Sequence, residues 1–151
     1  MFFNEGLALF HAQARDAREA IHLGSELLLE AGCVVRDFER HVWEREKQFP
    51  TGLDTEYTGV AIPHTDSAYV RQSQIAFVSL SAPVEFHFMA DASQIVRVGL
   101  VLVLAMSRPH EQVETLSSLM TLISSPESVA ALCECSSTEE LKRILARRGI
   151  R

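Results

Sequence analysis

The chain has 151 residues, of which 47% are apolar, and a formal net charge of −6 at pH 7. This length predicts a single domain over residues 1–151, large enough for a real core and too small for two. The 14 basic residues are scattered among 20 acidic ones, which argues against nucleic acid as a partner.

Apolar runs are too short for a membrane-spanning helix. The longest, residues 98–106, is about half of the roughly 18 to 20 residues that a span needs. The first residues carry no basic leader and no cleavage-like site, so we expect a cytoplasmic protein without a signal peptide or membrane insertion. The three cysteines are an odd number, which favours reduced thiols over a disulfide framework. Cys133 and Cys135 lack a second ligand pair at zinc spacing, so we expect no metal there.

The first third of the chain predicts one strand and two helices. Residues 6–10 alternate weakly between apolar and polar, as a strand does. From Asp16 onward, apolar residues recur at intervals of three and four, which predicts a helix that ends at Gly32 as its C′ glycine. A second helix is predicted over residues 36–47, and Pro50 follows as a breaker.

The middle of the chain predicts four more strands. Their ranges are 58–62, 73–80, 84–89 and 95–106, with a turn at Ala82 and Pro83 between the second and the third. Residues 95–106 form the most apolar segment, rich in Val and Leu. Such a strand is expected in the middle of a sheet that is covered on both faces.

The last third predicts three helices. Pro109 suits the first position of a helix whose apolar residues share one face. These residues are Val113, Leu116, Leu119, Met120 and Ile123. A short helix starts at Pro126, and Ser137 with Glu140 forms a capping box for the last. Helices on both sides of a mixed sheet are the economical packing of this pattern, so the predicted fold class is α/β.

One short stretch carries the candidate chemistry. Residues 59–66 read G-V-A-I-P-H-T-D. Pro63 has no backbone donor, so strand pairing should stop there and present the ring of His64 at a strand edge. Asp66 and its neighbours can cap a turn or bond one ring nitrogen, leaving the other free as a nucleophile. The alternative is a histidine that merely ends a strand.

This segment resembles that of a known family. Residues 59–64, preceded by R-E-K-Q-F-P-T-G-L at 45–53, resemble the phosphorylated-histidine segment of bacterial phosphotransferase-system (PTS) enzyme IIA domains of the fructose-mannitol type, or type 2. The residues at 49–53 and the P-H-T-D sequence at 63–66 resemble the galactitol-like branch of the family most. A second match is R-P-H-E-Q-V at 108–113. As an order of elements the likeness extends from about residue 17 to residue 148.

The resemblance implies a fold and a reaction. The family fold is a mixed, mainly five-stranded sheet between helices. The implied role is a phosphoryl carrier of a sugar or polyol PTS, which is a phosphotransferase. Its histidine accepts a phosphoryl group from phospho-HPr and passes it to a cysteine of enzyme IIB, which works with membrane component IIC. No metal or organic cofactor is required, and docking should use an apolar patch around His64.

The resemblance also assigns site residues. His64 matches the phosphoacceptor, as the tele-phosphohistidine, and Arg45 matches an arginine that supports the phosphoryl group. His110, at a helix N-terminus, matches the second active-site histidine, and the helix dipole there favours an anion. Thr51 and Asp66 are weaker candidates for phosphoryl contacts, because caps and turns account for them equally well.

The remaining features leave alternatives open. His11, His22, His41 and His87 show no pairing in the sequence, so we interpret them as structural or solvated. T-D follows His64 where the family commonly has glycine, which puts the sugar class in doubt. One alternative is a regulatory IIA-like module whose phosphorylation state controls a partner by binding. Another is a degenerate domain that no longer accepts phosphate, which the intact Arg45 and His110 disfavour.

Overall fold

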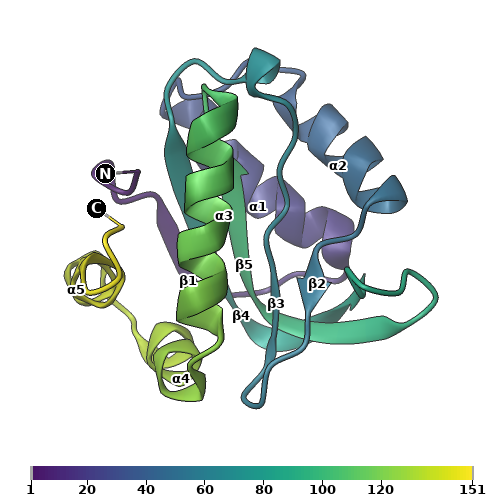
Figure 1. Ribbon diagram of the computed structural model, residues 1–151, viewed down its shortest axis with the longest axis vertical. Coiled ribbons are helices and arrows are strands. Elements are labelled where there is room, and N and C mark those ends of the chain that lie inside the picture. The colour runs from purple at the N-terminus through teal and green to yellow at the C-terminus, as the bar shows by residue number, and fades with distance from the viewer. Residues whose placement is uncertain (1, 151) are drawn as a thin grey trace.

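In the computed structural model, which describes residues 2–150, five strands form one mixed sheet in the order β1-β4-β5-β3-β2 (Figure 1). Strand β4 (Gln74–His87) pairs parallel with β1 (Ala8–Ala12) and antiparallel with β5 (Ile95–Ala105). Strand β3 (Gly59–Ala61) runs parallel to β5 and antiparallel to β2 (Gly52–Leu53). The predicted α/β class with a mixed five-stranded sheet is confirmed.

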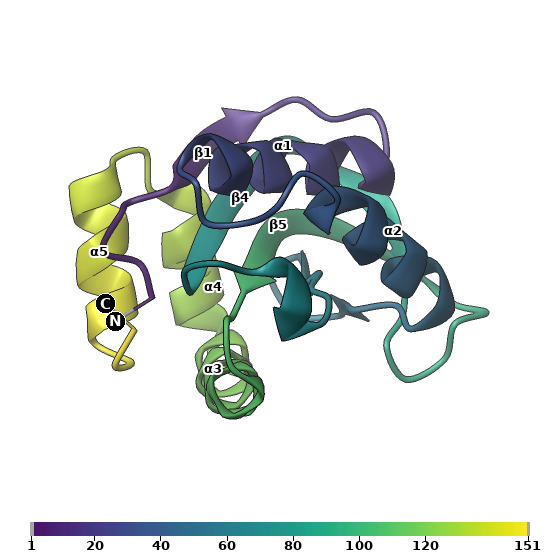
Figure 2. The ribbon, with the colours of Figure 1, turned by 90° about the horizontal axis from the view of Figure 1, so that it is seen from above.

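Helices cover both faces of this sheet, as Figure 2 shows. One face carries α1 (Ala17–Glu30) and α2 (Phe38–Gln48), and the other carries α3 (Pro109–Ile123), α4 (Pro126–Glu134) and α5 (Thr138–Ala146). A 3₁₀ turn, η1 (Ser67–Tyr69), precedes β4. Within residues 2–150 no single helix is long and apolar enough to cross a membrane, and α3 and α4 meet that test only as a pair bent by 96°.

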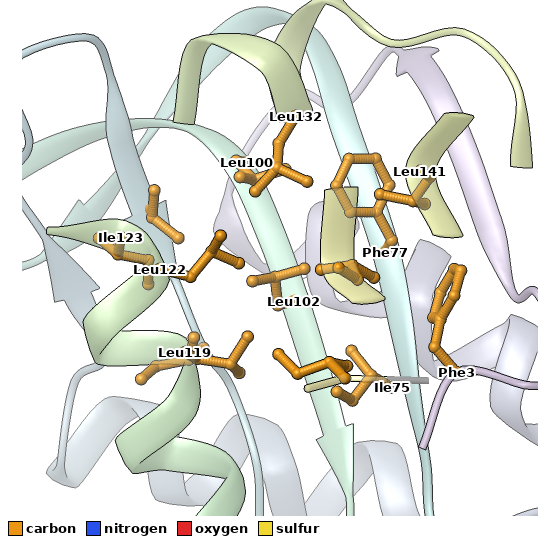
Figure 3. Packing of buried hydrophobic residues seen from close by; sticks show 14 of the residues in the cluster. Phe3, Ile75, Phe77, Leu100, Leu102, Leu119, Leu122, Ile123, Leu132 and Leu141 are labelled. Carbon is orange, nitrogen blue, oxygen red and sulfur yellow. The ribbon is translucent and has the colours of Figure 1, made fainter. Parts of the chain in front are cut away.

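The central strand β5 joins two apolar cores, one on each face of the sheet. Leu100, Leu102 and Leu104 belong to the core under α3, α4 and α5 (Figure 3). Val101 and Val103 alternate with them and belong to the core under α1 and α2. Successive side chains of a strand point to opposite faces, so a run that is apolar throughout is stable only when both faces are covered. The expected central position of this segment is confirmed.

Two helix termini follow from the sequence as predicted. Gly32 has φ +75°, and its N–H donates to Leu29 O at 3.0 Å while Cys33 N donates to Leu28 O at 3.0 Å. These two bonds form a Schellman motif, which a glycine at C′ permits. At α5, the Ser137 hydroxyl accepts from the Glu140 N–H at 3.2 Å.

The predicted turn at Ala82 and Pro83 is wrong. Residues 74–87 form one strand, and both halves pair with β5, Ser79 with Leu100 and Val84 with Val98. The register shifts between these two pairs, so the exposed Ala82 and Pro83 lie in an irregular bulge. A proline is tolerated at a bulge, because the hydrogen-bond ladder needs no N–H donor there. Alanine and proline in sequence are also typical of a turn, which is why a turn was predicted.

Two further features differ from the sequence-based expectation. Strand β2 was not predicted, because two residues are too short to show any alternation. The buried face of α3 is rotated from the predicted one: Thr115, Leu119, Leu122 and Ile123 are buried. Val113 and Met120, which were expected to pack inward, are 69% and 43% exposed. The prediction placed every apolar residue of this helix on the buried face, whereas in the structure some of these residues are exposed to solvent.

Neighbouring positions in α1 give opposite predictions for the same introduced residue. A Cβ at Gly24 would lie 2.5 Å from Val103 Cγ2, and this β-branched side chain cannot turn away. The adjacent Ser25 is buried and its hydroxyl has no hydrogen-bond partner among the described residues. We expect Gly24→Ala to lower the midpoint of thermal unfolding by about 2–4 °C and Ser25→Ala to raise it, because overpacking costs more than helix propensity returns. Scanning calorimetry that found both midpoints raised would contradict the close approach of α1 to the sheet.

Candidate functional site

His64 is held at the edge of the sheet by its own chain. Beyond β3 the chain stays against β5, because Pro63 O accepts from Leu104 N at 2.9 Å. His64 follows at once, and it is 8% exposed. Its Nδ1 lies 2.8 Å from the carbonyl oxygen of Ile62. A carbonyl oxygen only accepts, so Nδ1 carries the proton and Nε2 keeps its lone pair.

The surroundings of His64 favour the neutral ring. Burial lowers its pKa below the ordinary 6.5, and the positive charge of Arg45 lowers it further. The bond to Ile62 and the carboxylate of Asp66 act in the opposite direction without reversing the shift. A neutral imidazole with a free Nε2 is a nucleophile at pH 7.

Arg45 supplies positive charge beside this ring. It lies in the last turn of α2, half-buried, with its guanidinium 5.4 Å from the centre of the Phe49 ring. Its Nε is buried and has no hydrogen-bond partner among residues 2–150, and no carboxylate lies within ion-pair distance there. An arginine with unused donors next to a nucleophile is suited to receive an anion.

His110 lies at the same edge of the sheet as His64. It occupies the first turn of α3, is exposed, and makes no hydrogen bond within the described chain. Because β3 and β5 are parallel, the segments after both strands leave the sheet at one edge. Figure 1 shows the chain after β3 rising towards the end of the sheet where α3 begins. In this first turn Pro109 has no N–H, and the Glu111 and Gln112 N–H groups donate to Arg108 O, which leaves the His110 N–H without a partner in the described chain.

The two weaker candidates lie in different surroundings. Asp66 is exposed and caps η1 without a side-chain bond, but its charge reaches His64. Thr51 is 4% exposed and its hydroxyl donates to Glu46 Oε1 at 2.8 Å. The oxygen of this Thr51 hydroxyl also accepts a bond from the Ile62 N–H at 3.2 Å. Its proton is therefore not available to another acceptor.

Glu46 is a buried carboxylate that sequence reasoning missed. It is 7% exposed and accepts two bonds from Thr51, from the backbone N–H and from the hydroxyl, each at 2.8 Å. Burial raises its pKa to about 7, against the opposing effect of both Thr51 bonds and of Arg45. One signal was available: Phe38, Val42 and Glu46 are spaced by four, which places the carboxylate on the buried stripe of α2.

Three of the other histidines do have partners, contrary to expectation, and none of these partners is one of the candidate site residues. His22 Nδ1 lies 2.8 Å from Glu39 Oε1, and its Nε2 is 4.0 Å from Glu26. His41 stacks on Tyr69 with ring centres 3.8 Å apart. His87 Nδ1 lies 2.9 Å from a backbone carbonyl. A surface ion pair, a stacked ring and a loop contact account for these residues.

Residues 1–148 of the chain match one family model. The description of the model is phosphoenolpyruvate-dependent sugar phosphotransferase system, EIIA 2, and it covers residues 1–148. Among curated proteins, the chain is similar to the galactitol-specific EIIA component of the PTS of Escherichia coli K12. The two are 30% identical over 118 residues, which make up 78% of this chain and 77% of the relative.

Solved structures show the same fold. Enzyme IIA of mannitol from Escherichia coli, in its complex with phosphorylated enzyme IIB, superposes with a TM-score of 0.76 and 24% identity over 94% of this chain and 95% of that one. The nitrogen regulatory protein IIA-Ntr of Neisseria meningitidis gives a TM-score of 0.76 and 29% identity over 93% of each chain. This protein therefore belongs to the type 2 EIIA family of the sugar phosphotransferase system, and is a phosphotransferase component of that system.

Proposed function

We propose that this protein is the cytoplasmic phosphoryl carrier of a sugar or polyol PTS and that Nε2 of His64 is the phosphoacceptor. The observation that carries the proposal is the bond from His64 Nδ1–H to the Ile62 carbonyl, which leaves Nε2 free beside Arg45, a cation with no ion-pair partner among residues 2–150. Only a ring in this tautomer offers a lone pair at Nε2 without first losing a proton.

The proposed transfer runs in two steps with HPr as donor and enzyme IIB as acceptor. The Nε2 lone pair attacks the phosphorus of phospho-HPr, the new N–P bond forms, and the electrons of the broken bond return to the HPr imidazole. In the second step a cysteine thiolate of enzyme IIB attacks the same phosphorus and forms an S–P bond, and the electrons of the breaking N–P bond return to Nε2. Nδ1 keeps its proton and its bond to Ile62 throughout, so the ring needs no tautomer change.

The neighbouring groups stabilise the charge that is being transferred. The phosphoryl group spreads negative charge over three oxygens, so positioning and fixed donors contribute most of the catalysis. Arg45 offers unused guanidinium donors, and His110 offers its ring and its own backbone N–H at the same edge. We assign Asp66 a weaker role through its charge. We assign Thr51 an indirect role, because its hydroxyl binds the backbone of Ile62, whose carbonyl in turn binds His64.

The sugar class and a regulatory alternative rest on different relatives. The similarity to the galactitol-specific component supports a galactitol-like polyol. The similarity to nitrogen regulatory protein IIA-Ntr, at 29% identity, favours as a second candidate a regulatory module whose phosphorylation state controls a partner. Both candidates use His64 as phosphoacceptor, and they differ in whether an enzyme IIB accepts the group.

Exposed apolar side chains border the site on two sides. Val113 lies three residues after His110, so both share one face of α3, and Val113 is 69% exposed. On the other side Phe49 is 61% exposed and contacts the Arg45 guanidinium. We propose that these side chains form the docking patch that HPr and enzyme IIB use in turn.

Intact mass tests the carrier role. After incubation with phosphoenolpyruvate, enzyme I and HPr, we expect the wild type to gain one acid-labile phosphoryl group. The gain is absent in His64→Ala and is slowed about 10²-fold in His110→Ala, because a donor to the transferring group is lost. His22→Ala, a surface variant, should match the wild type. A wild type without added mass, when HPr is shown to be charged, would sink the proposal.

The titration of His64 tests its protonation state. Burial lowers the folded pKa below the ordinary 6.5, so the folded ring takes up its proton at a lower pH than the unfolded ring does, and the fold loses stability as the pH falls from 6.5 through the folded pKa. Nitrogen-15 NMR should show the Nδ1–H tautomer and a midpoint below 6.5. Arg45→Gln should raise this midpoint, because it removes a positive charge. An Nε2–H tautomer would contradict the assignment.

Transfer kinetics test the docking patch. We expect Val113→Ser to raise the KM for phospho-HPr about fivefold or more with little change in kcat, because it removes apolar contact outside the reacting atoms. Ile95→Ser is the matched control: Ile95 is 55% exposed but lies at the opposite end of β5 from His64. Equal effects of the two substitutions would argue against a patch on α3.

A further inference from the structure

We propose that Glu46 and Thr51 are positioning residues that hold His64 in its reactive tautomer by fixing the backbone of Ile62. This inference rests on the proposed role of His64 as phosphoacceptor. It concerns two buried side chains, Glu46 and Thr51, which are 7% and 4% exposed. The bonds that carry it connect α2, the chain before β2 and the chain after β3.

Thr51 takes the place of a missing rung in the sheet. In the antiparallel pair of β2 and β3, Gly52 lies opposite Ala61, so the register would place Thr51 opposite Ile62. The Thr51 N–H is turned to Glu46 instead, at 2.8 Å. Its side-chain oxygen then accepts the Ile62 N–H at 3.2 Å. A side chain thus continues the ladder one residue beyond the end of the backbone pairing.

Glu46 fixes the direction of that side-chain oxygen. The Thr51 hydroxyl donates to Glu46 Oε1 at 2.8 Å, so its lone pairs point towards the Ile62 N–H. The carboxylate needs no other partner, because its second oxygen accepts the Thr51 N–H. A buried carboxylate near neutrality is costly to retain, since burial raises its pKa to about 7. We infer that Glu46 is retained for the two hydrogen bonds that it accepts from Thr51.

Ile62 passes this constraint on to His64. Its N–H is held by Thr51 and its carbonyl accepts the proton of His64 Nδ1 at 2.8 Å. The next carbonyl, of Pro63, is held by Leu104 N. Without the Thr51 hydroxyl the Ile62 N–H would be buried and unpaired, and the residue whose carbonyl selects the tautomer would lose one of the bonds that fix its backbone. Small misplacements of a reacting group can cost about 10²-fold in rate.

A variant series at Thr51 separates positioning from simple packing. Thr51→Val keeps the shape and removes the hydroxyl, and Thr51→Ser restores the hydroxyl. Thr115→Val is the matched control, because Thr115 is also buried but bonds only to Met106 sulfur. We expect Thr51→Val to weaken or shift the His64 Nδ1–H signal in nitrogen-15 NMR and to slow phosphorylation by HPr roughly 10- to 100-fold. Thr51→Ser should return both readouts most of the way to the wild type, and Thr115→Val should leave both unchanged.

Two readouts keep this inference separate from the proposed function. The tautomer signal is measured without any phosphoryl donor, so its loss in Thr51→Val supports positioning even if the wild type accepts no phosphoryl group. An unchanged signal and an unchanged rate in folded Thr51→Val would overturn the inference. If Thr51→Val does not fold, Glu46→Gln serves instead, since its amide can accept only one of the two Thr51 donors and should shift the same signal. An unshifted signal in Glu46→Gln would then overturn the inference.

Discussion

The parallel pairing of β3 with β5 is the constraint on which the site depends. This pairing places the end of β3, a strand of three residues, beside the end of β5, the most apolar strand in the chain. The bond from Leu104 N to Pro63 O extends the pairing to the residue before His64. The segments that follow both strands leave the sheet at one edge, so His64 and the start of α3 lie there together. Because β5 is packed on both faces, this edge is anchored in the stable centre of the fold.

The site combines a neutral base with a cation that has no ion-pair partner. Burial and Arg45 both disfavour the charged form of His64, and the Ile62 carbonyl selects the tautomer. Arg45 in turn has no carboxylate at ion-pair distance among the described residues, although Glu46 is its neighbour in sequence. Glu46 accepts from Thr51 instead. This separation of charges leaves the guanidinium available for an incoming anion.

The sequence predicts the architecture well and the orientation of side chains less well. The apolar run of β5, the glycine at the end of α1 and the proline that begins α3 have local causes, so their places were predicted correctly. The bulge at Pro83 and the short β2 depend on partner strands, which no local pattern reveals. His64 could be found from its motif. Its tautomer could not, because that depends on one carbonyl in three dimensions. Glu46 was missed because a charged residue in a helix is usually taken as solvated.

The shortness of β2 has a consequence for turnover. This edge strand has two residues and follows Pro50, which has no N–H, so it offers almost no free backbone to a visiting protein. A partner strand laid along this edge would find few free main-chain groups, so we expect any partner contact at β2 to be made by side chains. Strand addition gives long-lived complexes through many main-chain bonds, whereas small side-chain contacts dissociate quickly. The carrier role proposed above needs such short-lived contacts, because one partner must leave before the next can bind.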